Sequence, residues 1–172
     1  MKTLATKKNC TKISFDFHGV INKHPTFFKN LSTEFMCRGF EIYIVSGGPF
    51  NDIKEYLLIH EIPYSAIWCI FDYYEQKDKI TVFADGSFHM DDKLWNEAKA
   101  VYCRKQNICL HIDDSTIYKK YFTTPYCLYD TETQTGYIGN YLINFSSPAE
   151  ETATDILSVL SSLNSAAEVS HR

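Results

Sequence analysis

The sequence predicts an α/β fold in three layers, with a mostly parallel five-stranded sheet that carries helices on both faces. Three observations predict it. Short β-rich runs alternate with segments of helical periodicity, several of these runs end on polar residues, and 172 residues with 45% hydrophobic composition suit a single core. Strands that alternate with helices pair in parallel through right-handed crossovers. We therefore expect the carboxyl ends of several strands to meet at one edge of the sheet.

The first half of the chain contains three predicted strands, two predicted helices and a hairpin. The first strand is predicted around Ile13, Phe15 and Phe17, which point to one face of a sheet while the residues between them point to the other. The other elements are a helix over about 25–38, a strand over 41–45, a helix around 53–60, a strand over 66–71 and a hairpin over 80–90 that turns at Asp85-Gly86.

The alternation continues in the second half. Asp91 can cap a helix that reaches about Asn107. Then follow a strand over 108–112, a short helix over 117–122, a strand over 126–129, an added strand or hairpin over 136–145, and a helix after Ser147. We expect one domain over residues 10–163 with a small hairpin insert at about 74–90. Residues 1–9 and 164–172 are expected to be flexible tails, with the last ten residues disordered.

Charge and cysteine content narrow the classes of partner and compartment. The net charge of −4 argues against a broad basic surface for nucleic acid, and the lysines near the N-terminus are interpreted as a solvated tail. The six cysteines show no CxxC pair and no zinc-like spacing, so free, mostly buried thiols are expected. No run resembles a signal peptide or a membrane helix, which predicts a cytoplasmic protein without a membrane partner.

Three predicted strands end in polar groups. Asp16 and His18 follow the first strand, Ser46 and Gly47 follow the second, and the pair Asp113-Asp114 follows the fourth. Carboxylate oxygens are the ligands that magnesium prefers, and a glycine lets a phosphate approach the backbone closely. Each motif alone also suits a turn or a helix cap, so the interpretation depends on their occurrence together.

In this order the motifs resemble those of the haloacid dehalogenase (HAD) superfamily: an acidic strand end, a Ser/Thr strand end, a helical lysine and a late acidic pair. The resemblance covers residues 13 to about 129. It is strongest to small, nearly capless viral and bacterial members and more distant to the 5′-deoxynucleotidases. It implies a Rossmann-like fold and a phosphatase in which Asp16 becomes phosphorylated. The alternative is another doubly wound domain, such as a flavodoxin-like one.

The resemblance also implies a site. Magnesium would be held by Asp16, Asp114 and the backbone carbonyl of His18, with Asp113 holding a water molecule beside it. Ser46, Gly47 and a lysine would bind the phosphate. Lys99 is preferred for this role because Trp95 and Tyr102 flank it at helical spacing, whereas Lys93, Lys77 and Lys79 remain alternatives.

His18 stands where phosphatases of the superfamily carry a second aspartate, the residue that protonates the leaving oxygen. An imidazole can both give and take protons near neutrality, so His18 is a candidate acid and base, or else a structural histidine. The other histidines, His111 and His24 among them, are interpreted as structural. The sequence thus predicts a magnesium-dependent phosphatase acting on a nucleotide or other small phosphate ester. A nucleic-acid end as substrate and a silent phosphate- or nucleotide-binding protein are the alternatives.

Overall fold

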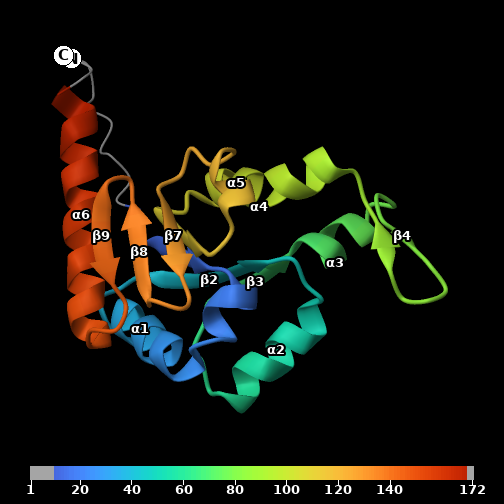
Figure 1. Cartoon of the computed structure of the whole chain (residues 1–172), viewed down its shortest axis with the longest axis horizontal. Coiled ribbons are helices and arrows are strands. Elements are labelled where there is room, and N and C mark those ends of the chain that lie inside the picture. The colour runs from blue at the N-terminus through green and yellow to red at the C-terminus, as the bar shows by residue number, and fades with distance from the viewer. Residues whose placement is uncertain (1–9, 170–172) are drawn as a thin grey trace, which may run out of the picture.

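The computed structural model describes residues 10–169 and has a seven-stranded sheet at its centre (Figure 1). Its strands are β1 (Lys12–Phe15), β2 (Glu41–Ser46), β3 (Ala66–Cys69), β6 (Leu110–Asp113), β7 (Tyr126–Asp130), β8 (Thr135–Ile138) and β9 (Tyr141–Asn144). They lie in the order β3-β2-β1-β6-β7-β8-β9. The first five pair in parallel, and β8 and β9 extend the sheet as antiparallel strands. The predicted α/β class is confirmed. The sheet has seven strands instead of the predicted five, because the added strand or hairpin expected over 136–145 forms β8 and β9 and pairs with the edge of the sheet.

Helices lie on both faces of this sheet. They are α1 (Pro25–Cys37), α2 (Phe50–Ile59), α3 (Ile70–Glu75), α4 (Asp92–Gln106), α5 (Thr116–Lys119) and α6 (Ala149–Val169). Figure 1 shows α1 and α2 on one side of the sheet and α4 and α5 on the other, with α6 beside β8 and β9. Two short strands, β4 (Thr81–Val82) and β5 (Phe88–His89), form a separate hairpin beyond α3. The arrangement is consistent with a Rossmann-like fold.

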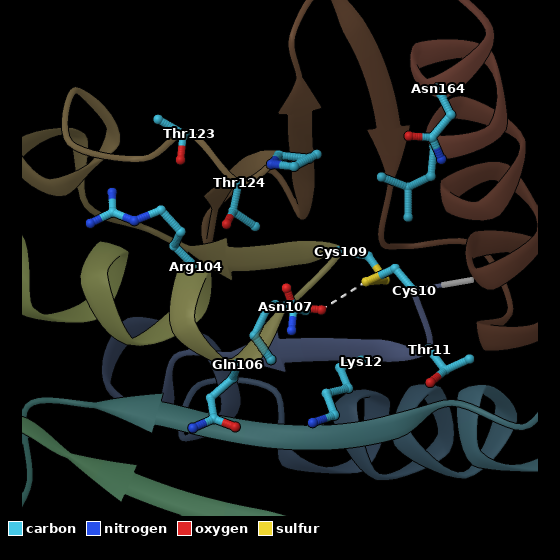
Figure 2. Close-up of a pocket in the computed structure, with 13 residues that line it drawn as sticks. Cys10, Thr11, Lys12, Arg104, Gln106, Asn107, Cys109, Thr123, Thr124 and Asn164 are labelled. Atoms are coloured by element: carbon cyan, nitrogen blue, oxygen red, sulfur yellow. Dashed lines mark hydrogen bonds between the residues drawn. A yellow bond between two sulfur atoms is a disulfide. The ribbon is translucent and has the colours of Figure 1, made fainter. Parts of the chain in front are cut away.

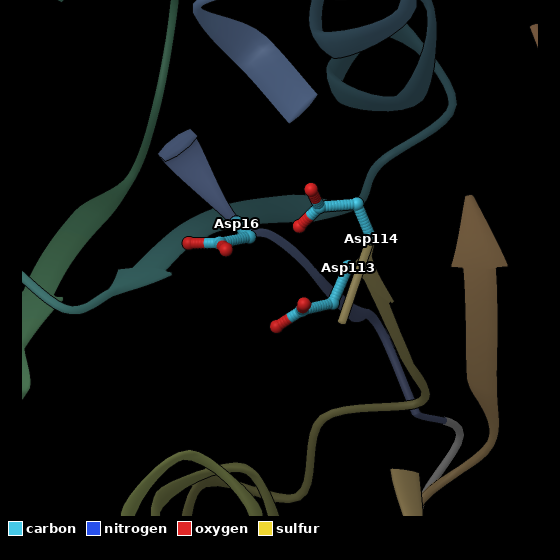
Figure 3. Close-up of side chains that lie close together, drawn as sticks. All are labelled: Asp16, Asp113 and Asp114. Atoms are coloured by element: carbon cyan, nitrogen blue, oxygen red, sulfur yellow. The ribbon is translucent and has the colours of Figure 1, made fainter. Parts of the chain in front are cut away.

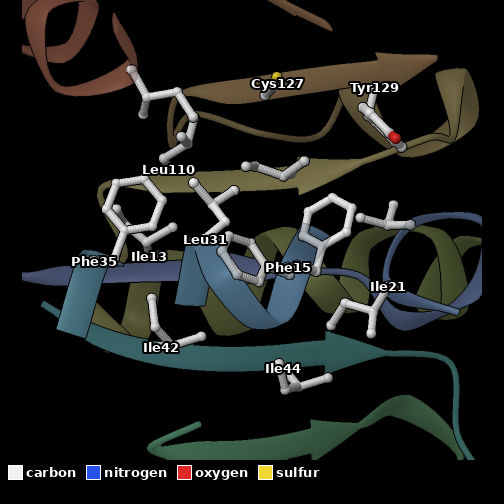
Figure 4. Close-up of a cluster of buried hydrophobic side chains, with 14 of the residues drawn as sticks. Ile13, Phe15, Ile21, Leu31, Phe35, Ile42, Ile44, Leu110, Cys127 and Tyr129 are labelled. Carbon is white, nitrogen blue, oxygen red and sulfur yellow. The ribbon is translucent and has the colours of Figure 1, made fainter. Parts of the chain in front are cut away.

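The face under α1, α2 and α6 holds the main hydrophobic core (Figure 4). Ile13 and Phe15 of β1 are completely buried there, and Phe15 packs against Phe28 of α1 with ring centroids 5.4 Å apart. Alternate residues of the neighbouring strands reach the same face: Ile42, Ile44, Leu110 and Ile112. Burial of this apolar surface is the main favourable contribution to folding.

The opposite face of the central strands is polar. Ser14 lies beside His111 in the register of β1 and β6, and both side chains are completely buried. Because side chains alternate along a strand, Asp16 and Asp113 follow them on this face. Helix α4 covers them with Lys99, which is only 2% exposed. The second face of the sheet thus holds a buried polar cluster instead of a second large apolar core.

Several local predictions need correction. The strand predicted over 66–71 ends at Cys69, because α3 begins at Ile70. Helix α6 continues to Val169, so residues 164–169 of the predicted flexible tail are helical. Residues 170–172 and the predicted tail at 1–9 lie outside the described residues. No helix between residues 10 and 169 combines the length and apolar character needed to cross a membrane.

The cysteine prediction is also partly wrong. Cys10 and Cys109 form a disulfide across a sequence separation of 99 residues. Cys69, Cys103 and Cys127 are free and buried as predicted, whereas Cys37 is free and exposed. Burial raises the pKa of the Cys103 thiol to about 12, which keeps it protonated and unreactive at neutral pH. The sequence offered no signal for the pairing, because the two cysteines meet only when β1 and β6 align.

Candidate active site

Two acidic strand ends lie side by side at the carboxyl edge of the sheet. Phe15 is in register with Ile112, and the next amide along the chain, that of Asp16, donates to the Ile112 carbonyl at 2.8 Å. This pairing brings Asp16 next to Asp113, the last residue of β6. The edge where parallel strands end is also where open α/β sheets bind ligands. Both carboxylates are buried, with 5% and 0% of the residue exposed.

A lysine from α4 bridges these carboxylates. Lys99 Nζ lies 2.8 Å from Asp16 Oδ2 and 2.8 Å from Asp113 Oδ2, and 4.8 Å from the centre of the Tyr118 ring. Burial alone would lower the pKa of Lys99, but the charges of Asp16 and Asp113 outweigh burial and raise this pKa above its ordinary value. The lysine is therefore a fixed cation between two carboxylates.

Asp113 is held from three sides. Its Oδ2 lies 3.1 Å from His111 Nε2 in addition to its contact with Lys99, and its Oδ1 accepts from the Ser115 amide at 2.8 Å. Burial would raise the pKa of Asp113, but the neighbouring Lys99 and the hydrogen bond from His111 hold it well below its usual range. Asp113 is thus anionic and oriented, with both oxygens engaged by protein groups.

His111 continues this network to β1. Its Nδ1 lies 2.8 Å from Ser14 Oγ, and its ring stacks on Phe122 at 5.0 Å with an interplanar angle of 3°. His111, predicted to be structural, is fully buried, and it contacts the site residue Asp113. The sequence contained a signal for this contact, because His111 and Asp113 are two residues apart on a strand and therefore lie on the same face.

Asp114 brings a third carboxylate to the site (Figure 3). Oxygens of Asp16, Asp113 and Asp114 lie within 4.8 Å of one another. Burial and the charges of Asp113 and Asp16 raise the pKa of Asp114, and among the described residues it forms no ion pair. A Cβ on Gly19 would lie 2.0 Å from Asp114 Oδ2, so glycine at this position leaves the room that the carboxylate occupies.

His18 and Ser46 meet at the same edge. Asp16 caps the turn Phe17–Ile21 by accepting from the Phe17 amide, and this turn carries His18, which is exposed. His18 Nδ1 lies 3.3 Å from the hydroxyl of Ser46, the last residue of β2. Gly47 follows in the loop after β2, where both it and His18 line a cavity. The predicted site residues are therefore gathered around one strand edge.

The alternative lysines lie elsewhere. Lys93 has 77% of its side chain exposed and lies 3.9 Å from Glu97. Lys77 donates to the Tyr73 hydroxyl at 2.8 Å, and Lys79 is exposed before the hairpin. Of these four lysines, Lys99 is the one that contacts the acidic cluster.

A second cavity lies at the opposite end of the sheet (Figure 2). Its volume is about 440 Å³, and it surrounds the Cys10–Cys109 disulfide where β1, β6 and β7 begin. Lys12 and Arg104 also line it. It is larger than the cavity beside His18, which has a volume of about 390 Å³, yet the carboxylates lie at the other end of the strands, so it is not part of the acidic site.

The fold and the site together define an α/β protein with a lysine-bridged carboxylate cluster at the carboxyl edge of a mostly parallel sheet. No protein-family model matches the chain, and no match was found among curated proteins or solved structures. The functional interpretation therefore depends on the geometry of the cluster and on the resemblance of its motifs.

Proposed function

We propose that this protein is a metal-dependent phosphomonoester hydrolase that works through a phospho-aspartate at Asp16. The observation that carries the proposal is the position of Lys99 Nζ, 2.8 Å from an oxygen of Asp16 and 2.8 Å from an oxygen of Asp113. A carboxylate that attacks a phosphate dianion meets a repulsion of about 4 kcal/mol per charge pair at contact for an effective dielectric constant of 20. A fixed cation at the nucleophile offsets part of this repulsion.

The three carboxylates fit a magnesium ion. Their oxygens lie within 4.8 Å of one another, and burial together with the charges of Asp113 and Asp16 raises the pKa of Asp114 despite the nearby charge of Lys99. Asp16 and Asp114 would hold the ion, with the carbonyl of His18, while Asp113 stays bound to Lys99 and His111. The chemistry that magnesium supplies is neutralisation of charge on the phosphoryl oxygens.

The chain's own groups account for the bond changes. An Asp16 oxygen attacks phosphorus, the bond from phosphorus to the ester oxygen breaks, and the departing oxygen takes a proton from His18. A water oxygen then attacks phosphorus and gives a proton to His18, and the bond from phosphorus to the Asp16 oxygen breaks, which releases phosphate and restores the carboxylate. Asp16 accepts one hydrogen bond from Phe17 and pairs with Lys99, which leaves lone pairs on a carboxylate with about four acceptor positions.

Ser46 and Gly47 would bind the phosphoryl oxygens. The Ser46 hydroxyl lies at the end of β2 and can donate, while Gly47 offers a backbone amide without a side chain in the way. The side chain of His18 is exposed and directed toward Ser46, so it lies at the border between phosphate and leaving group.

The test is phosphate release from 5′- and 3′-nucleotides, sugar phosphates and para-nitrophenyl phosphate, with magnesium or with EDTA. We expect magnesium-dependent release that Asp16→Asn abolishes and Asp155→Asn, at an exposed position of α6, leaves unchanged. Undiminished release from a folded Asp16→Asn protein would refute the mechanism.

One observation favours a second candidate, a phosphate- or nucleotide-binding protein without turnover. His18 replaces the superfamily's second aspartate, and its Nδ1 is already within 3.3 Å of Ser46 Oγ. If that contact persists with substrate bound, Nδ1 of His18 cannot deliver a proton to the leaving oxygen. Magnesium-dependent binding of nucleotides without phosphate release would identify this case.

A further inference from the structure

A cavity of about 390 Å³ opens beside His18. One wall is His18 with the loop 47–49 after β2, and the other consists of Phe71 of α3, Phe88 of β5 and Trp95 of α4. This volume lies within the range of small-molecule pockets, about 300–1,000 Å³. The cavity therefore has room for a group larger than a phosphate.

The aromatic wall combines a hydrogen-bonded indole and a partly exposed phenylalanine ring. Trp95 Nε1 donates to the Tyr118 hydroxyl at 3.2 Å, which fixes the indole. Phe88 lies on the hairpin, with its ring centroid 5.4 Å from Trp95 and 5.1 Å from Phe71, and remains 42% exposed. Aromatic rings at such separations attract another ring through stacked or edge contacts.

The cavity is continuous with the proposed phosphate site. His18 and Gly47 belong to both, and a Cβ on Gly47 would lie 3.3 Å from Trp95 Cζ2. Glycine thus lets the indole lie directly against the loop that would bind phosphate. A group esterified to a phosphate on Ser46 and Gly47 would extend past His18 toward these rings.

Resting on the proposed function above, we propose that this cavity binds the leaving group of the ester and selects a flat aromatic ring system. The described residues that line it include no acidic side chain, lysine or arginine, and His18 lies at its border with the phosphate. A charged or strongly hydrated group would lose water there without a compensating partner. An aromatic ring would instead cover the exposed part of Phe88 and stack on the fixed indole.

Two probes isolate the ring from the rest of the ester. AMP and ribose 5-phosphate release phosphate from the same type of primary alcohol and differ by the adenine base. The measurement is the ratio of their kcat/KM values in the parent protein, in Phe88→Ala and in Phe83→Ala. Phe83 is the matched control, because it is 50% exposed near the same hairpin but does not line the cavity.

We expect the parent to prefer AMP, and Phe88→Ala to lower this preference about 5- to 150-fold, the range for loss of one ring that stacks on a base. Release from ribose 5-phosphate should stay at the parent value, and Phe83→Ala should keep the parent ratio. Trp95→Leu gives a second variant in case Phe88→Ala does not fold. The proposal would be overturned if the parent had nearly equal kcat/KM values for AMP and ribose 5-phosphate. It would also be overturned if neither Phe88→Ala nor Trp95→Leu changed the ratio of these values.

Calorimetry separates failure of this proposal from failure of the proposed function. If the parent releases phosphate from neither probe, hydrolysis of these esters fails, and binding of AMP and ribose 5-phosphate with magnesium becomes the readout. Tighter binding of AMP that weakens in Phe88→Ala and not in Phe83→Ala supports the aromatic subsite. Equal binding of both probes, or binding of neither, overturns it.

Discussion

Lys99 Nζ lies 2.8 Å from Asp16 Oδ2 in a position where the lysine side chain is 2% exposed and the aspartate side chain 7%. Two buried charges are costly to remove from water, and they remain stable inside a protein only when each has partners in good geometry. Asp113 supplies the second partner at the same distance. The cluster is therefore both a structural element under α4 and the centre of the proposed site.

Lys99→Met should destabilise the fold by about 3–5 kcal/mol, the usual effect of removing one partner of a buried charge pair. It leaves Asp16 and Asp113 without their cation, so phosphate release should also disappear. Urea unfolding gives the free energy of unfolding. The control is Lys93→Met on the same helix, where an exposed pair contributes about 0–1 kcal/mol. Equal stability of the two variants would contradict the bridging role.

His111→Phe tests whether Asp113 needs its second side-chain partner. The substitution keeps an aromatic ring against Phe122 but removes both hydrogen bonds, to Asp113 Oδ2 and to Ser14 Oγ. We expect a loss of about 1–3 kcal/mol in unfolding free energy for the polar groups left unpaired. The proposed activity should fall in kcat with little change in KM. The control is His60→Phe, because the His60 ring packs tilted against Tyr56 and is not a site residue; this variant should leave kcat unchanged.

Gly19→Ala should remove magnesium binding. The new Cβ would lie 2.0 Å from Asp114 Oδ2, so the carboxylate must move. Gly19 also has a φ of 76°, and a side chain there costs about 1–2 kcal/mol in backbone strain. Gly39→Ala separates the two effects, because Gly39 has a φ of 86° but open space around it. We expect the two variants to be destabilised by comparable amounts. Magnesium binding, measured by calorimetry, should be lost in Gly19→Ala alone. Intact binding there would contradict the role of Asp114.

Local signals in the sequence predicted most of the fold. Asp91 caps α4 as expected, accepting from the Leu94 amide at 2.8 Å, and the alternation in β1 predicted which residues reach the core. The strand or hairpin expected over 136–145 includes most of β8, although Gly136 by itself weakens a strand. In the folded chain a Cβ on Gly136 would lie 2.7 Å from Cys127 Sγ and 2.8 Å from Phe145, so glycine is what lets β8 pack there. Such a requirement arises from tertiary contacts, which local propensity does not contain.

The site was predicted less completely. Its acidic residues follow strand ends, a local pattern, and the aromatic neighbours of Lys99 favoured it over Lys93, but the contact of Lys99 with Asp16 depends on how α4 lies over the sheet. The aromatic cavity was missed entirely, since Phe71, Phe88 and Trp95 come from three separate elements. Residues that converge through packing leave no spacing in the sequence to detect them.

Asp114→Asn should stabilise the metal-free protein at neutral pH. The pKa of Asp114 is raised in the folded state, so the folded protein binds this proton more tightly than the unfolded chain, where an aspartate has a pKa of about 3.9. Stability then falls as pH rises through the interval between the two values, and the full penalty remains above it. Melting temperatures in EDTA should therefore be higher for Asp114→Asn at pH near 7 and equal to the parent at pH near 3.

Magnesium should reverse this order, because a cation stabilises the ionised carboxylate. The melting temperature of the parent should rise with magnesium, and that of Asp114→Asn should stay almost constant. Asp155→Asn, at an exposed position of α6, should follow the parent under both conditions. A magnesium-dependent rise of equal size in Asp114→Asn would remove this residue from the metal site.

His18→Ala should lower phosphate release about 100-fold or more, the usual contribution of a positioned acid and base. Binding of AMP to the same variant should change little, because the phosphate is expected to bind mainly to Ser46, Gly47 and the metal. His18→Asp is the sharper comparison, since it restores the carboxylate of the superfamily pattern on the same turn. Release below the parent in both variants, with His60→Ala at the parent value, indicates that the imidazole transfers the proton. Release well above the parent in His18→Asp indicates instead that the natural histidine limits hydrolysis. The physical reason would be the contact of His18 with Ser46 Oγ at 3.3 Å, which holds the ring away from the leaving oxygen. The protein would then act mainly by binding its ligand.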